Sequence, residues 1–214
     1  MEEALTIRLP DGPALEARLA PVANPKGGFV VCHPHPLYGG DMDNPVVIRA
    51  SEVAQAAGYA TLRFNFRGVG ASEGVHDKGR GEQEDVRGAM AALATHLPAG
   101  SRVGVMGYSF GAAMAARAAR PSDPEAPLGL IAPPLGMYDF DFLKGDSLQT
   151  SPGRLLLVAG TADSYCPVEA LHRLAAITSA AERIIEGADH FFFGKLYPMG
   201  EAIGAWLAGA PPAR

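Results

Sequence analysis

Ser109 is the residue of this sequence whose type and surroundings most directly indicate chemistry. Residues 107–111 are Gly-Tyr-Ser-Phe-Gly, a Gly-x-Ser-x-Gly pattern. An apolar run ends just before this pentapeptide and an alanine-rich segment follows it, which places the serine on a tight turn between a strand and a helix. Such a turn exposes the hydroxyl, and the start of the helix directs backbone N–H groups at negative charge that develops beside it. The pattern therefore predicts a nucleophilic serine.

A serine hydroxyl is a weak nucleophile until a base removes its proton, and a third group must orient that base. Two histidines follow Ser109: His172 in the middle of a predicted helix, and His190 in a loop after a predicted strand. The loop position favours His190 as the base. Asp163, in a Gly-Thr-Ala-Asp loop after another predicted strand, is the preferred orienting acid. The competing acids downstream are Asp139, Asp141, Asp146, Glu169, Glu186 and Asp189.

The elements that must position these residues alternate along the chain. We expect strands at 5–9, 15–20, 28–32, 59–64, 102–106, 128–132, 154–159 and 183–185, and helices at 45–57, 81–97, 109–119, 168–178 and 194–207. The first two strands form an antiparallel hairpin. The remaining alternation predicts an α/β fold with a mostly parallel, doubly wound sheet. Ligands bind such sheets at the carboxyl ends of the strands, where the candidate residues fall.

Composition agrees with one folded domain over residues 1–214. The chain is 48% hydrophobic and 19% charged, which excludes a disordered chain, and its net charge of −5 gives no reason to expect nucleic acid as a partner. No run approaches the roughly 20 apolar residues of a membrane helix, and the first residues are acidic rather than basic. We therefore expect a cytoplasmic protein, with Cys32 and Cys166 reduced and buried.

Three short motifs in this order, at 107–111, 160–163 and 188–190, resemble the α/β-hydrolase superfamily. Two longer segments, His-Pro-His-Pro-Leu-Tyr-Gly-Gly-Asp-Met-Asp-Asn at 33–44 and Arg-Phe-Asn-Phe-Arg-Gly-Val-Gly-Ala-Ser-Glu-Gly at 63–74, are similar to those of small, lidless bacterial serine hydrolases. These are related to dienelactone-hydrolase-like and serine-aminopeptidase-like enzymes. The resemblance covers nearly the whole chain and implies an α/β-hydrolase fold with a serine–histidine–aspartate triad and no lid domain.

The resemblance also implies an oxyanion hole. In the superfamily, the residue after a His-Gly pair donates its backbone N–H to the oxyanion. Here His33-Pro34 stands in that place, so His35 is the matching residue. Proline has no N–H, and His35 lies between two prolines, so His35 is the donor that this loop offers. The second donor is the N–H of Phe110, next to the nucleophile.

The same loop allows two other interpretations. His33 and His35 form a His-x-His pair that occurs in some metal sites, but the usual continuation and a third histidine at ligand spacing are absent. We therefore expect no metal and no cofactor, while a purely structural loop stays an alternative. The glycine-containing segment 65–72 lacks the spacing of a phosphate or dinucleotide loop. It is expected to tie neighbouring loops together through Arg67 or Ser72.

Short loops are expected to form the walls of the site. Segment 133–153, where this fold can carry a cap, is too short for a separate lid domain. The three phenylalanines at 191–193 are expected to anchor their loop in the core. The residues expected to contact the substrate are Leu37, Tyr38, Met137 and Tyr138.

Together these features predict a serine hydrolase that cleaves carboxylic esters, with short acyl groups, through an acyl-enzyme intermediate. The same triad also serves amide or peptide cleavage, and a catalytically silent hydrolase fold used for binding is a further alternative. The expected partner is a small-molecule ester, with neither nucleic acid nor membrane. A monomer and a homodimer are both compatible with the sequence.

Overall fold

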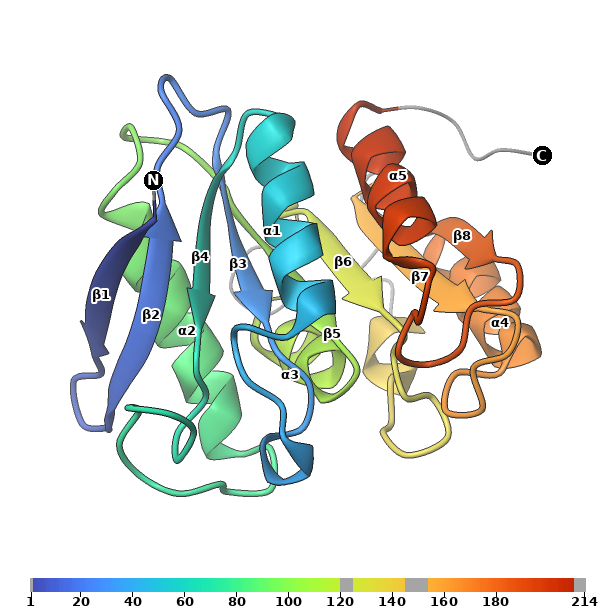
Figure 1. Ribbon diagram of the computed structural model, residues 1–214, viewed down its shortest axis with the longest axis horizontal. Coiled ribbons are helices and arrows are strands. Elements are labelled where there is room, and N and C mark those ends of the chain that lie inside the picture. The colour runs from blue at the N-terminus through green and yellow to red at the C-terminus, as the bar shows by residue number, and fades with distance from the viewer. Residues whose placement is uncertain (1, 120–124, 145–153, 210–214) are drawn as a thin grey trace.

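One mixed sheet forms the centre of the structure, a computed structural model that describes residues 2–119, 125–144 and 154–209 (Figure 1). Its strands are β1 (Glu3–Arg8), β2 (Ala14–Ala20), β3 (Gly28–Cys32), β4 (Ala60–Phe64), β5 (Val103–Tyr108), β6 (Leu128–Ile131), β7 (Leu155–Gly160) and β8 (Ala181–Ile185). They lie in the order β1-β2-β4-β3-β5-β6-β7-β8. The pairs β1–β2 and β2–β4 are antiparallel and the rest are parallel, so the expected α/β sheet with its N-terminal hairpin is confirmed.

Burial along the strands follows their hydrophobic pattern. Every residue of β3 and β7 is buried, as continuous apolar runs require when helices cover both faces of a sheet. β4 is also buried throughout, and its polar residues Thr61 and Arg63 hydrogen-bond to Ser51 and to the carbonyl of Met42. β2 instead alternates between buried and half-buried positions along most of its length. This period of two is typical of a strand that has one well-covered face.

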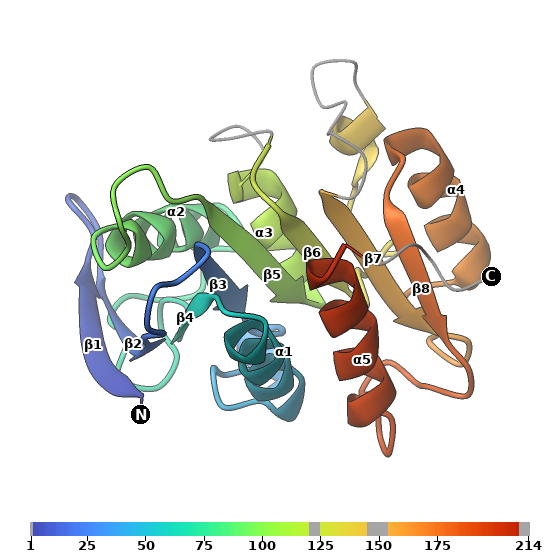
Figure 2. The same ribbon diagram turned by 90° about the horizontal axis from the view of Figure 1, so that it is seen from above.

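In the described ranges, five helices cover the two faces of this sheet. They are α1 (Pro45–Ala56), α2 (Gly81–Ala94), α3 (Phe110–Ala119), α4 (Val168–Thr178) and α5 (Leu196–Leu207). Figure 2 shows α1 and α5 on one face and α2, α3 and α4 on the other. Each face buries its own apolar cluster, so the described part of the chain has a layer of helices, the sheet, and a second layer of helices.

Helix boundaries follow local chemistry. α1 begins as expected, since the side chain of Asn44 accepts a hydrogen bond from the N–H of Val46 at 3.0 Å and Pro45 occupies the first turn. α2 ends at Ala94, three residues before the predicted end. The N–H groups of Thr95 and the next two residues bond to carbonyls three residues back, which tightens the chain before a proline.

The strand order reverses at β3, which pairs with β4 on one side and with β5 on the other. The chain leaves β3 through the helix α1 on one face and leaves β4 through α2 on the opposite face (Figure 2). Ligands bind such sheets in the crevice at this reversal, beyond the carboxyl ends of the strands. The loops after β3 and β5, which carry His35 and Ser109, meet at that point.

Two short 3₁₀ helices complete the described elements, η1 (Pro36–Tyr38) and η2 (Asp141–Lys144). Of the segment that stands where a cap is possible, residues 133–144 are described and 145–153 lie outside the described residues. In the described ranges no helix has the length and apolar character needed to cross a membrane. Cys32 and Cys166 are both buried and unpaired, as expected, and burial raises the pKa of both thiols.

Candidate active site

Ser109 lies on the turn between β5 and α3 with a backbone φ of 55°, a value that residues other than glycine rarely adopt. Two glycines allow this turn. A Cβ on Gly107 would lie 2.2 Å from the carbonyl oxygen of Gly111, and a Cβ on Gly111 would lie 2.4 Å from the carbonyl oxygen of Cys32. The N–H of Ser109 donates to the carbonyl of Ile131 at 2.9 Å. Backbone contacts on both sides therefore hold the serine in a strained, fixed position.

The imidazole of His190 connects Ser109 to Asp163. Its Nε2 lies 2.9 Å from the serine Oγ, and its Nδ1 lies 3.0 and 2.9 Å from the two carboxylate oxygens of Asp163. The carboxylate is fully buried and the imidazole is 10% exposed. A carboxylate can only accept, so Nδ1 carries the proton that it donates to Asp163. Nε2 is then left as the acceptor for the proton of the serine hydroxyl.

The turn after β7 positions Asp163. Its Oδ1 accepts hydrogen bonds from the N–H groups of Tyr165 at 2.9 Å and Cys166 at 3.0 Å. At the end of the same strand, a Cβ on Gly160 would lie only 2.0 Å from the carbonyl oxygen of Ala188. The strand that presents the acid is thus in direct contact with the loop that presents the histidine.

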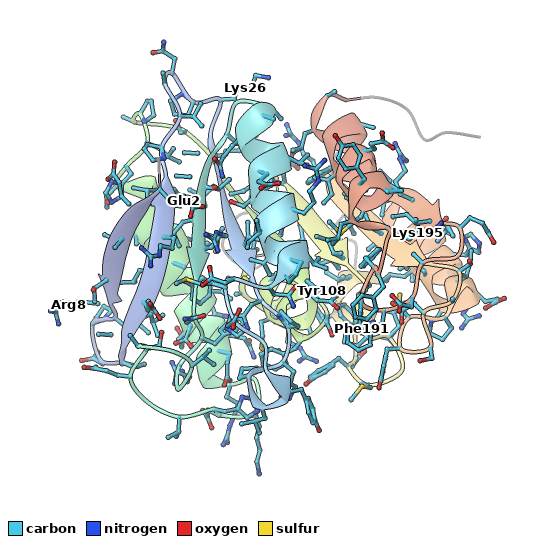
Figure 3. All side chains as sticks on the ribbon, viewed as in Figure 1. Glu2, Arg8, Lys26, Tyr108, Phe191 and Lys195 are labelled. Carbon is cyan, nitrogen blue, oxygen red and sulfur yellow. The ribbon has the colours of Figure 1, made fainter. Side chains whose placement is uncertain are left out.

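His190 lies in the loop after β8, and contacts of neighbouring residues fix this loop. The hydroxyl of Tyr108 donates to the carbonyl of His190 at 2.9 Å, and Figure 3 labels Tyr108 and Phe191 at this edge of the sheet. Phe192 has a φ of 54° and is fully buried, whereas Phe191 and Phe193 are exposed. The expectation that all three phenylalanines anchor the loop is therefore wrong for two of them. The positive φ at Phe192 turns the chain so that its neighbours face solvent.

His35 lies in the loop after β3 and Phe110 is the first residue of α3, and their rings lie 4.8 Å apart. The carbonyl of His35 accepts the N–H groups of Tyr38 and Gly40, each at 3.1 Å, and its Nδ1 accepts the N–H of Leu37 at 3.2 Å. In the described part of the chain, no hydrogen bond engages the N–H of His35 or of Phe110. Both groups are therefore available to a ligand.

His33 joins the loop after β3 to the loop after β4. Its Nδ1 donates to the carbonyl of Pro34 at 2.6 Å and its Nε2 accepts the N–H of Phe66 at 3.0 Å. Burial lowers the pKa of His33 to about 4, so the ring is neutral at pH 7. Both ring nitrogens are occupied by protein partners, which argues against the His-x-His metal site. Among the described residues, no group of three potential ligand side chains is suitably arranged for a metal ion.

The segment 65–72 makes the ties that its composition indicated. The guanidinium of Arg67 binds the buried carboxylate of Asp85 at 2.7 Å. The side chain of Asn65 accepts the N–H of Met42 at 2.8 Å, and the hydroxyl oxygen of Ser72 accepts the N–H of Glu16 on β2 at 2.9 Å. This segment thus supports the loops around the site.

Two residues beside the site, His76 and Glu82, had no recognisable signal in the sequence. The fully buried Glu82 accepts the N–H groups of Asp77 and Gly79, each at 2.8 Å, and its Oε1 lies 2.8 Å from Nδ1 of His76. The ring of His76 lies 4.9 Å from that of His35. Burial lowers the pKa of His35, and the neighbouring His76 lowers it further.

A cavity of about 390 Å³ opens above Ser109 and His190. Of the residues expected to contact substrate, Tyr38, Met137 and Tyr138 line it, whereas Leu37 does not and is 69% exposed on η1. The lining also includes residues that sequence reasoning did not propose, chiefly Tyr108, Tyr165 and Phe191. The part of the chain that the structure describes contributes fifteen lining residues, none of which is Asp, Glu, Lys or Arg.

A larger cavity of about 590 Å³ lies between the segment around η2 and the helix α4. It shares Tyr138 with the first cavity but includes none of Ser109, Asp163 and His190. Chemistry by these three side chains therefore belongs to the smaller cavity.

Known proteins resemble this chain over most of its length. An uncharacterized protein of Rickettsia prowazekii is 35% identical over 209 residues, which is 92% of this chain and 85% of the relative. The crystal structure of an α/β serine hydrolase without a lid from Xanthomonas campestris is 32% identical with a TM-score of 0.85, covering 100% of this chain and 96% of that one. An esterase of Pyrococcus furiosus, at 20% identity, a TM-score of 0.77 and coverage of 98% and 93%, shares the fold.

The model of the alpha/beta hydrolase domain matches residues 30–196. That range includes the sheet reversal at β3, the turn at Ser109 and the loops that hold Asp163 and His190, so the match extends over the whole candidate site. The chain therefore belongs to the α/β-hydrolase family.

Proposed function

We propose that this protein is a serine hydrolase that cleaves neutral carboxylic esters of small molecules through an acyl-enzyme intermediate. The observation that carries the proposal is the continuous set of hydrogen bonds from Asp163 through His190 to Ser109, which ends in an open cavity. A serine held at 2.9 Å from a correctly protonated imidazole is the arrangement that nucleophilic acyl transfer requires.

Each residue has a defined part in the proposed reaction. His190 Nε2 takes the proton of Ser109 as the serine oxygen attacks the ester carbonyl, and Asp163 stabilises the imidazolium that forms. The N–H groups of His35 and Phe110 bind the oxyanion, and the loss of one such donor typically costs about 10²–10³ in rate. His190 then gives its proton to the departing alcohol. Water, activated by the same imidazole, hydrolyses the acyl-enzyme.

The composition of the cavity favours esters over amino-terminal peptide substrates. A substrate with a free ammonium or carboxylate group would have to lose its hydration, and a buried charge without a partner is costly. Among the described residues, none that lines the cavity is Asp, Glu, Lys or Arg. Hydrolysis of neutral amides by the same residues stays an alternative, and aminopeptidase substrates assayed beside esters would distinguish the two.

We further propose that the acyl group is short. The cavity of about 390 Å³ is near the lower end of the range for small-molecule sites, and it must also hold the reacting carbonyl.

The decisive experiment treats the protein with a fluorophosphonate and measures its intact mass, beside hydrolysis of esters with two to sixteen acyl carbons. We expect one adduct, activity that is highest with the shortest acyl groups, and loss of both adduct and activity in Ser109→Ala. Ser101→Ala, in a loop at the opposite end of β5, is the matched control and should keep both. An unlabelled wild-type protein, or an adduct that survives in Ser109→Ala, would refute the nucleophile and favour a binding role.

A further inference from the structure

Three exposed aromatic side chains lie near His190: Tyr165 and Phe191, which line the cavity, and Phe193, which packs beside Phe191. We name these three residues the aromatic rim. They are 46%, 57% and 77% exposed. The rings of Tyr165 and Phe191 lie 4.8 and 5.6 Å from the imidazole of His190, on which both pack, and the ring of Phe193 lies 5.8 Å from that of Phe191. Exposed apolar groups gathered at one place mark binding surfaces.

The backbone around the rim holds these side chains outward. Oδ1 of Asp189 accepts the N–H groups of Phe191 at 3.0 Å and Phe193 at 3.2 Å, while Phe192 between them is buried at a positive φ. The N–H of Tyr165 donates to the carboxylate of Asp163, which also binds the imidazole. One hydrogen bond thus ties Tyr165 directly to Asp163 of the catalytic pair, while Asp189 fixes the backbone of Phe191 and Phe193. The exposure of the rim therefore follows from a hydrogen-bonded backbone.

The proposed reaction places a different part of the substrate on each side of Ser109, and this determines which part lies next to the rim. The oxyanion is expected beside His35 and Phe110, whose rings pack on one another at 4.8 Å. The leaving alcohol must lie at Nε2 of His190, because it receives its proton there. Three aromatic side chains flank that imidazole and also line the cavity: Tyr165, Phe191 and Tyr108. Tyr108 is buried, so Tyr165 and Phe191 are the two whose rings are exposed to a departing alcohol.

We propose that the aromatic rim is a leaving-group subsite that takes an uncharged aromatic alcohol, so that the substrates are esters of short acids with aryl or arylalkyl alcohols. This assignment rests on the proposed ester hydrolysis. Aromatic rings attract one another in offset or edge-to-face geometry beyond the effect of the apolar area that they bury. A ring on the alcohol can contact both rim residues next to the imidazole, whereas a polar chain of similar length cannot.

Matched esters test the subsite. Benzyl acetate and 2-methoxyethyl acetate have the same acyl group and alcohols of similar acidity, so the ratio of their kcat/KM values reports the alcohol's contacts. We expect a ratio of about ten in favour of benzyl acetate, and a fall towards one in Tyr165→Ala and Phe191→Ala. Phe191→Tyr should retain the preference. Tyr197→Ala is the control, since Tyr197 is 71% exposed on α5 and packs under Arg49, 4.7 Å away.

Acyl transfer gives a second readout that needs no variant. An alcohol acceptor reaches the acyl-enzyme through the site from which the leaving alcohol departed. Its oxygen bonds to the acyl carbon, the bond from that carbon to Ser109 Oγ breaks, and the alcohol's proton passes through His190 to the serine. With 4-nitrophenyl acetate as donor, we expect benzyl alcohol to divert several times more acetyl from water than 2-methoxyethanol does at equal concentration.

The outcomes separate the subsite from the proposed function. If the wild type labels at Ser109 and hydrolyses both acetates with a ratio near one, the subsite is refuted and the function stands. Methyl phenylacetate is the isomer of benzyl acetate that has its ring on the acyl side. The subsite would also be overturned if the enzyme preferred methyl phenylacetate, but not benzyl acetate, over 2-methoxyethyl acetate. A dimer of this protein would overturn the subsite as well, if Phe193→Ala dissociated the dimer and left the ratio of the two kcat/KM values unchanged. A second copy of the chain would then be the group that covers the rim. Absence of labelling and of all hydrolysis would refute the function itself.

Discussion

The proposed chemistry depends on the orientation of single side chains as much as on their residue types. The buried carboxylate of Asp163 binds the imidazole of His190 with both oxygens, and one of these oxygens also accepts two backbone N–H groups. Those two donors determine which way the carboxylate is turned. At the residue scale, the tautomer of His190 therefore depends on the turn that follows β7.

Replacement of Asp163 with asparagine is expected to lower kcat by about 10⁴-fold. The N–H groups of Tyr165 and Cys166 require an oxygen at the position of Oδ1, so the amide nitrogen of the asparagine faces Nδ1 of His190. The amide then donates to Nδ1 and leaves the ring proton on Nε2, which can no longer accept the proton of Ser109. Steady-state kinetics with a short acetate ester measures the loss.

The melting temperature of Asp163→Asn, measured beside the kinetics, separates this effect from misfolding. A folded variant that keeps more than about a tenth of the wild-type kcat would contradict the proposed tautomer.

At the scale of elements, loops from four strands must meet without gaps at the carboxyl edge of the sheet. Gly160 shows how closely they pack, because a Cβ there would lie 2.0 Å from a carbonyl of the histidine loop. On the other side of Ser109, the start of α2 supports the proposed oxyanion loop. Oε1 of Glu82, in its first turn, lies 2.8 Å from Nδ1 of His76, and the ring of His76 packs against that of His35. Elements that carry no catalytic group thus determine where the reacting atoms lie.

Glu82→Gln is expected to lower kcat by about tenfold, less than the loss of a whole oxyanion donor, with KM changed much less. The carboxylate accepts the N–H groups of Asp77 and Gly79, so an amide nitrogen would face one of these donors and leave it unpaired. The loop then shifts, and His76 no longer braces the loop of His35. Kinetics on an acetate ester, with kcat and KM separated, measures the effect.

The matched control is Glu182→Gln, which removes a carboxylate that lies 2.8 Å from the half-exposed His172 on α4. Equal losses of kcat in the two variants would show that Glu82 acts on overall stability alone.

At the scale of the whole molecule, buried polar links join the layers across the sheet reversal. Arg67 and Asp85 connect the loop after β4 to α2, and His33 connects the loop after β3 to Phe66. The link at His33 requires a neutral ring, since Nε2 must accept a hydrogen bond. Burial is the largest cause of its lowered pKa. The stability of the fold is therefore coupled to pH through this residue.

The free energy of unfolding is expected to fall as the pH falls from about 6.5 to about 4. The pKa of His33 is about 4 in the folded chain and about 6.5 when unfolded, so the unfolded chain binds more protons between these values. The neutral ring makes its full contribution to the free energy of unfolding above pH 6.5. About 3 kcal/mol of that contribution is lost by pH 4.

Urea unfolding of the wild type and of His33→Gln at pH 7 and pH 4 measures this coupling. Glutamine has no titrating group, so the variant should lose about 3 kcal/mol less between the two pH values. Parallel losses in the two proteins would assign the pH dependence to other groups.

Most elements of the fold were predictable from local patterns. The run Gly28–Cys32 and the helix Val168–Thr178 have the predicted bounds, because an apolar run between turn signals and a helical periodicity are properties of neighbouring residues. The end of α2 was predicted three residues too late, because the chain tightens into a 3₁₀-like turn before Pro98. Boundaries depend on hydrogen bonds that a periodic pattern does not reveal.

In the candidate active site, too, local patterns predicted some features, and other features depended on tertiary contacts. The nucleophile turn, and the loops that carry His190 and Asp163, were identifiable in the sequence because each follows a strand, and parallel strands end at one edge of the sheet. Only the tertiary structure decided that Phe192 is buried while Phe191 and Phe193 are exposed, and that Leu37 does not line the cavity. It also decided that Glu82 lies beside His76, whose ring packs against that of His35. The direction of a loop side chain depends on contacts with distant segments, such as the 2.9 Å bond from Tyr108 to the carbonyl of His190, and no local pattern specifies those.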